Sequence, residues 1–165
     1  MGQVRKFQTG GVFNTPFELG LRMVYVLCAL RPKGADLQKL VLLDYAIVYS
    51  GDIDGPPSLH TPVPFRGGEL LSRRSLIEKG LYLMSTRGLV DATVDQSGIT
   101  YHGGPAALAL VGSLSSPYFR ALDNRCRWAA QRFGDADSLS LTKQFSDLGH
   151  RWGAELESFA VHGRA

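Results

Sequence analysis

The residues most able to do chemistry lie in one Pro/Gly-rich stretch, YSGDIDGPPSLHTPVPFRGG, which runs from Tyr49 to Gly68. Asp52 and Asp54 stand one residue apart, and His60 follows them. A catalytic carboxylate pair would need two environments that separate its pKa values, on a rigid frame. A calcium loop would need a further acidic ligand at a later position, which this stretch lacks. We therefore expect a connector, in which the aspartates cap turns and His60 lies at the surface.

The rest of the sequence carries no motif for catalysis or for a cofactor. It contains no G-x-S-x-G, no P-loop and no G-x-G-x-x-G. Metal-ligand spacing is absent among the histidines, which are His60, His102, His150 and His162. Cys28 and Cys126 lie in expected helices and are interpreted as free thiols of a reducing compartment. We expect a protein that is not an enzyme and has no cofactor, metal or small-molecule substrate.

Length and charge fit one ordinary globular protein. The chain has 165 residues and a formal net charge of +3. This mild excess of positive charge permits contact with DNA but does not require it. No apolar run is long enough, without charges, to cross a bilayer or to act as a signal core. We expect a cytoplasmic protein with no membrane partner.

Local signals predict three helices in the first half of the chain. Thr15, Pro16 and Glu18 form a helix start, and Pro32 must end that helix. Its expected buried residues, which begin at Phe17, recur at helical spacing: Phe17, Leu21, Val24 and Cys28, widened by Met23, Leu27 and Leu30. Asp36 is expected to cap a second helix, which Gly51 stops, and a third helix is expected over residues 69–88.

The second half of the chain begins with an expected β-hairpin. β-formers in 90–94 and 99–101 flank a turn sequence, Asp95-Gln96-Ser97-Gly98. A short helix over 105–114 and a helix from Pro117 to Gly134 follow. The order helix, helix, helix, hairpin, helix predicts a mostly α protein with a small β-hairpin, a winged helix-turn-helix with additional C-terminal helices.

Three parts of the chain are therefore expected. Residues 1–13 form a polar leader, and 14–134 form a winged-helix domain with a Pro/Gly-rich insertion at about 50–68. Residues 135–165 form an amphipathic helical segment. The insertion replaces the tight turn that usually joins the second and third helices of this motif.

The third helix occupies the position that reads DNA in winged-helix proteins. Its candidate DNA-binding residues are basic: Arg66, Arg73, Arg74, Lys79 and Arg87. The alternative is a solvated face on which arginines pair with Glu69 or Glu78. Leu76 and Leu83 make the helix apolar on a second side, which favours packing over insertion into a groove. A further set of arginines, interpreted as surface residues, follows Pro117: Arg120, Arg125, Arg127 and Arg132.

The last segment carries an apolar stripe with the spacing of a helix. Its candidate partner-binding residues are Leu141, Phe145, Leu148, Trp152, Leu156 and Phe159. Two interpretations stay open. The stripe either folds back on the core of its own domain or lays its apolar face on a partner helix, with Trp152 as the anchor.

Several blocks of the sequence together resemble the middle component of bacterial ABC-three-component systems, which include the Lamassu type. The blocks are FNTPFELGLRMVYVL, DLQKLVLLDYAIVYSGD, SLHTPVPFRGGELLSRRSLIEKGLYLMSTRGLV, SGITY and SPYFRALDNRCRWAAQRFG. They cover the chain from Phe13 to Gly134. The resemblance brings no catalytic motif with it.

The resemblance implies a small adaptor subunit in an anti-phage and anti-plasmid defence complex. Its partners would be an SMC-like ABC ATPase and an effector, such as a nuclease subunit, with contact to DNA only in the assembled complex. The alternative is a winged-helix transcription regulator that binds DNA as a dimer. A regulator should present its arginines as one stripe along the third helix, whereas an adaptor should bury that helix or expose apolar patches.

Overall fold

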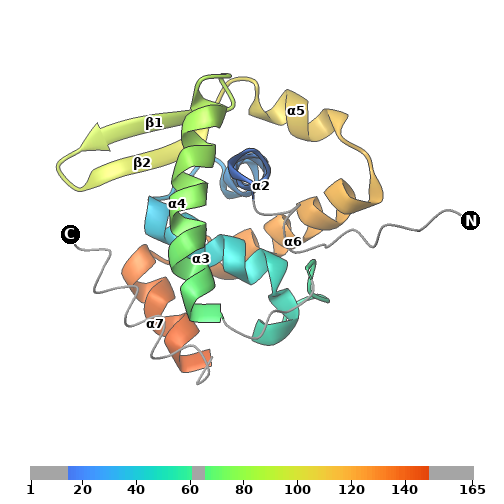
Figure 1. Cartoon of the computed structure of the whole chain (residues 1–165), viewed down its shortest axis with the longest axis vertical. Helices are drawn as coiled ribbons and strands as arrows, with labels where there is room; N and C mark the ends of the chain where they lie inside the picture. The colour runs from blue at the N-terminus through green and yellow to red at the C-terminus, as the bar shows by residue number, and fades with distance from the viewer. Residues whose placement is uncertain (1–14, 61–65, 149–165) are drawn as a thin grey trace, which may run out of the picture.

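The computed structural model describes residues 15–60 and 66–148, and within this part the protein is mostly helical with one antiparallel hairpin (Figure 1). The elements are α2 (Pro16–Leu30), α3 (Leu37–Val48), the 3-10 turn η1 (Ser50–Ile53), α4 (Arg66–Ser85), β1 (Val90–Asp95), β2 (Gly98–Gly103), α5 (Ala107–Ser113), α6 (Pro117–Phe133) and α7 (Ser138–Leu148). The expected elements are confirmed for the described residues.

The helix starts follow from local capping, as the sequence indicates. Thr15 Oγ1 accepts a hydrogen bond from Glu18 N at 3.2 Å, and Asp36 Oδ1 accepts one from Lys39 N at 2.8 Å. Ser116 caps α6 in the same way. Each side chain satisfies an amide that the first helical turn leaves without a partner.

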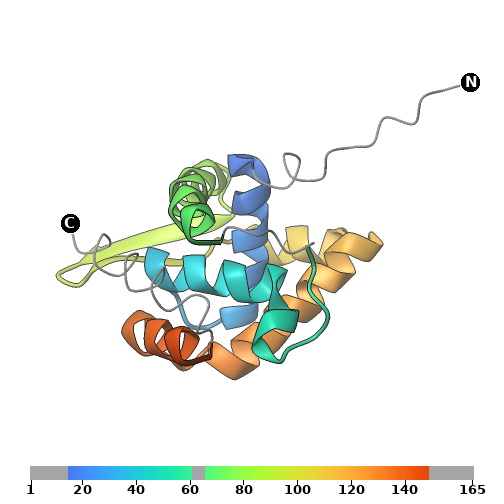
Figure 2. The ribbon, with the colours of Figure 1, turned by 60° about the horizontal axis from the view of Figure 1, so that its bottom comes forward.

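The core lies where α2 and α3 are enclosed by the other helices. α4 packs across α2 and α3 on one side, and α6 packs against both helices from the other (Figure 2). This enclosure buries nearly the whole of α3 and most of α2. Phe17 was expected in the core, but 52% of its surface is exposed, because it precedes the part of α2 that is covered.

The hairpin is joined to the helical body by a short third pairing. β1 and β2 pair in the register Val90 to Gly103, and Ala35, between α2 and α3, bridges to Tyr101. Ala35 N donates to Tyr101 O at 2.9 Å, and Tyr101 N donates to Ala35 O at 2.8 Å. The base of the hairpin is therefore fixed to the α2–α3 connection.

The insertion after α3 is held against α6 by arginine side chains. Arg125 Nη2 donates to Pro57 O at 2.8 Å, and Arg132 Nη1 donates to Ile53 O. Gly55 lies so close to the Trp128 ring that a Cβ there would be 2.3 Å from it. The interpretation of Arg125 and Arg132 as plain surface residues is therefore wrong, because they anchor the backbone of the insertion.

Helix α7 completes the core from the far side of α3. Leu141 and Phe145 are fully buried, and the Phe145 ring meets the Phe133 ring at 5.2 Å between centroids. Lys39 Nζ donates to Gly134 O at 2.8 Å and to Ala136 O at 2.6 Å, which fixes the turn between α6 and α7. The described part of the C-terminal segment thus packs on its own chain.

Among the helices in the described ranges, none combines the length and the apolar character that crossing a membrane requires.

Candidate protein-docking surface

A buried charge cluster fixes the helices that form the candidate surface. Arg22 of α2 grips Asp44 of α3 with two bonds, Nε to Oδ1 at 2.8 Å and Nη2 to Oδ2 at 3.2 Å. Arg73 of α4 donates from Nη1 to Asp44 Oδ2 at 2.6 Å. All three side chains are buried. One carboxylate therefore ties three helices together.

The charge state of this cluster follows from its arginines. Burial by itself would raise the pKa of Asp44, but the charges and hydrogen bonds of Arg22 and Arg73 outweigh it and bring the pKa to about 2. Asp44 is thus a carboxylate across the neutral range. Because its pKa is depressed in the folded state, its contribution to stability is complete above its ordinary value of 3.8 and is lost as the pH falls through about 2.

His60 lies beside this cluster rather than at the surface, which corrects the expectation from the sequence. Its Nε2 is 3.1 Å from the Tyr118 hydroxyl, and its amide donates to Val48 O at 3.0 Å. Asp54 is exposed and takes a left-handed conformation, with φ at 58°, at the end of η1. The turn hydrogen bonds of the insertion come instead from Ser50 Oγ to Pro56 O and from Gly51 N to Ser58 Oγ.

The position of His60 predicts a loss of stability in mild acid. Burial, followed by the positive charge of Arg22, lowers the pKa of His60 from 6.5 to about 4. The unfolded chain therefore takes up a proton more readily, so stability is complete above pH 6.5 and falls as the pH drops toward 4. Urea unfolding at pH 7.5 and 4.5 should show a smaller difference in His60→Gln than in the wild type, by about 1–2 kcal/mol. Equal differences in the two proteins would contradict this placement.

Helices α2 and α4 cross at a contact between two glycines. A Cβ on Gly80 would lie 2.5 Å from Pro16 O and 2.6 Å from Gly20 N. A Cβ on Gly20 would lie 2.6 Å from Gly80 O. The helix backbones approach this closely because neither position carries a side chain.

A groove runs along the outer side of this crossing and is the candidate docking surface. Its volume is about 610 Å³, and its lining residues come from the start of α2 and the outer face of α4: Pro16, Ser75, Glu78, Lys79, Tyr82 and Leu83. Tyr82 is 71% exposed although it is a large aromatic side chain. Exposed tyrosine beside apolar surface is typical of protein interfaces. We name these six residues the α2–α4 groove.

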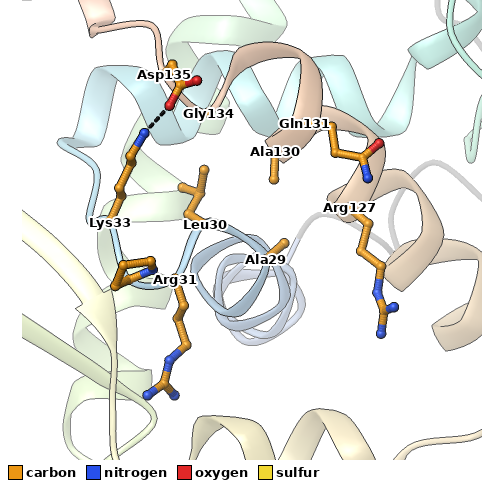
Figure 3. A pocket seen from close by; sticks show the side chains of 10 residues that line it. Ala29, Leu30, Arg31, Lys33, Arg127, Ala130, Gln131, Gly134 and Asp135 are labelled. Atoms are coloured by element: carbon orange, nitrogen blue, oxygen red, sulfur yellow. Dashed lines mark hydrogen bonds and ion pairs between the residues drawn. The ribbon is translucent and has the colours of Figure 1, made fainter.

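A second hollow, of about 310 Å³, lies where α2 and α6 end (Figure 3). Arg31, Lys33 and Arg127 line it. Two of these cations already have carboxylate partners, because Lys33 pairs with Asp135 and Arg127 pairs with Asp123. Since the hollow lies at helix C-termini, where cations are favourable, its charges have a structural explanation.

The structure places the candidate DNA-binding residues apart from one another. Arg73 is buried against Asp44 and is removed from that set, because its guanidinium is not accessible to DNA. Arg74 is half-buried, whereas Lys79 and Arg87 are exposed. Arg87 donates from Nη1 to Leu83 O at 2.9 Å, at the end of α4. The side chain of Arg66 lies outside the described residues.

The candidate partner-binding stripe divides in a similar way. Leu141 and Phe145 cannot meet a partner, because they are buried in the core of their own chain. For these two residues, the interpretation that the stripe folds back is correct. The side chain of Leu148 and the residues Trp152, Leu156 and Phe159 lie outside the described part of the chain.

The groove residues Tyr82 and Leu83 were not assigned as a site from the sequence, although a signal was present. Ser75, Lys79 and Tyr82 recur at intervals of four and three, which places them on one line along α4. Leu83 indicated a second apolar side of this helix. Only the crossing with α2 shows that Pro16 joins the same surface.

The fold and this groove define a small helical protein that presents an exposed, largely apolar surface. Comparison with known families matches residues 12–155 to the ABC-three component (ABC-3C) system Middle Component 2. The chain therefore belongs to the middle components of ABC-three-component systems, as the sequence blocks indicate, and the match extends beyond Gly134. No curated protein and no solved structure matches the chain significantly.

Proposed function

We propose that this chain is a non-catalytic adaptor that bridges an SMC-like ABC ATPase and an effector, such as a nuclease, in a Lamassu-type defence complex. The observation that carries the proposal is the exposed α2–α4 groove in a chain that belongs to a family of middle components. A middle component works beside other components, so a surface for protein contact is the feature that its role requires. Aromatic side chains such as Tyr82 are favoured anchors in such contacts.

The order and pairing of the elements support a winged-helix architecture for the adaptor. α2, α3 and α4 precede the hairpin, and the Ala35–Tyr101 bridge adds a short strand-like segment between the first two helices. In this arrangement α4 occupies the recognition position and the hairpin is the wing. The insertion, anchored by Arg125 and Arg132, takes the place of the tight turn.

The distribution of charge on α4 favours an adaptor over a transcription regulator. The exposed groove holds Lys79 next to Glu78, and Arg73 is turned inward to Asp44. A helix that inserts into DNA needs a stripe of available cations. In the described side chains of α4, the outer line is instead formed by hydroxyl-bearing residues, Lys79 and Tyr82.

Replacing Tyr82 by glutamate should weaken the complex with the other components by at least about tenfold, because it puts a charge into an apolar contact. The full chain, co-expressed with the ATPase and effector of its system, is measured by the amount of each component that co-purifies. Tyr82 is mostly exposed, so the fold should survive the change.

Leu139→Glu is the matched control, since Leu139 is an apolar residue of α7 with 69% exposure and does not line the groove. It should leave co-purification unchanged. If the wild-type chain captures neither component, the adaptor function is wrong. If Tyr82→Glu captures both as well as the wild type does, the groove is not the docking surface.

A further inference from the structure

The β-hairpin carries an apolar face that leaves the core and continues into solvent. Alternation along the strands puts Val90, Ala92 and Val94 on one face, with Ile99 and Tyr101 opposite them. Val90 is buried at the base of the hairpin. Near the tip, the directly opposed pair Val94 and Ile99 is 76% and 46% exposed. Two β-branched side chains thus project at the tip, where the helices do not cover them (Figure 1).

The charge of the hairpin indicates what this face can meet. Residues 90–103 contain two aspartates, Asp91 and Asp95, and neither lysine nor arginine, so the formal charge of this segment is 0 − 2 = −2. Both aspartates are exposed. Phosphate groups would be repelled, whereas a surface with lysine or arginine around an apolar depression would be attracted.

The hairpin is also held in one conformation before any partner arrives. Two hydrogen bonds between Ala35 and Tyr101, at 2.9 and 2.8 Å, fix its base. Asp95 Oδ1 accepts from Ser97 N at 2.7 Å, and Gly98 takes the φ of 121° that the turn needs. A preformed element loses little conformational entropy on binding, which favours its use as a docking element.

We propose that the tip of the hairpin, Val94 and Ile99, docks into an apolar socket with a basic rim on another component of the ABC-three-component system. This inference rests on the proposed function, because an adaptor that bridges two proteins needs a second surface besides the α2–α4 groove. Two side chains bury too little area to hold a stable complex. The tip therefore acts together with the groove, and the wing contacts protein rather than DNA.

The test is the affinity of the full chain for the purified ATPase and for the purified effector of its system, at low and high salt. The variant Val94→Thr with Ile99→Thr keeps the shape and the β-branching and removes the apolar groups. It should bind one component about tenfold more weakly. Asp91→Lys should weaken the same complex most at low salt, because it repels a basic rim. Asp95 is left in place since it caps the turn.

The control changes the reverse face, where Thr93 opposes Thr100. Thr93→Val with Thr100→Val makes the opposite chemical exchange and should leave the affinity unchanged. Matching thermal unfolding of the wild type and of both double variants shows that the fold is intact.

Other outcomes overturn the inference in distinguishable ways. If the wild type binds neither component, the proposed function fails as well. If the wild type binds and the Val94/Ile99 variant binds equally, only the docking of the tip is wrong. Light scattering that shows a wild-type dimer and a monomeric variant would assign the tip to a second copy of this chain. A variant that loses affinity for duplex DNA alone would assign it to DNA.

Discussion

Asp44→Asn should lower the free energy of unfolding by about 3–5 kcal/mol. The side chain keeps its size but loses the charge that compensates two buried guanidinium groups, those of Arg22 and Arg73. A buried cation without its counter-charge pays the desolvation cost in full, and here two of them share one partner. Urea unfolding at pH 7, followed by circular dichroism, measures the loss.

Asp123→Asn provides the matched control. Asp123 pairs with Arg127 one helical turn away at 3.0 Å, and the Arg127 side chain is mostly exposed. Exposed pairs of this kind contribute about 0.3–0.5 kcal/mol, so this variant should unfold almost as the wild type does. If Asp44→Asn costs less than about 1 kcal/mol, the cluster is not the buried tie between α2, α3 and α4.

The local elements of the fold could be predicted because their signals lie within a few residues. Thr15, Asp36 and Ser116 cap the helices that were expected to begin there. The turn at Asp95–Gly98 likewise joins the two strands. Capping and turn formation are decided by neighbours in the sequence, so no knowledge of the packing was needed.

The roles of the arginines could not be predicted, because they depend on contacts distant in sequence. Arg73 looks like a surface cation of an amphipathic helix, yet its partner Asp44 lies 29 residues earlier. Arg125 reaches Pro57 across a separation of 68 residues. Side-chain type permits both a solvated and a buried arginine, and only the packing of helices decides between them.

The candidate site could be predicted only in part, for the same reason. The apolar character of α4 beyond its core face was visible at Leu83, but the groove exists because Pro16 of α2 lies beside it. The stripe at Leu141 and Phe145 was visible too, and its spacing alone could not show that Phe133 would cover it. Periodicity identifies an apolar face and leaves its partner open.

Gly80→Ala should destabilise the protein, although alanine is normally the better helix residue. In an open helical position the change would add about 1 kcal/mol of stability. At Gly80 the new Cβ would lie 2.5 Å from Pro16 O, which belongs to backbone and cannot turn aside. We expect a net loss of about 1–3 kcal/mol, as for other overpacked sites, measured by thermal and urea unfolding.

Gly112→Ala separates the effect of crowding from the effect of helix propensity. Gly112 lies in α5, and a Cβ there would meet nothing within 4 Å. This variant should gain about 0.4–1 kcal/mol, so the two glycine-to-alanine changes should have opposite signs. Gly80→Ala should also lower co-purification with the other components, because α4 must move away from α2 and widen the groove between Pro16 and Tyr82. If both variants gain stability equally, the glycine crossing does not set the distance between these helices, and the groove has no fixed width for a partner to recognise.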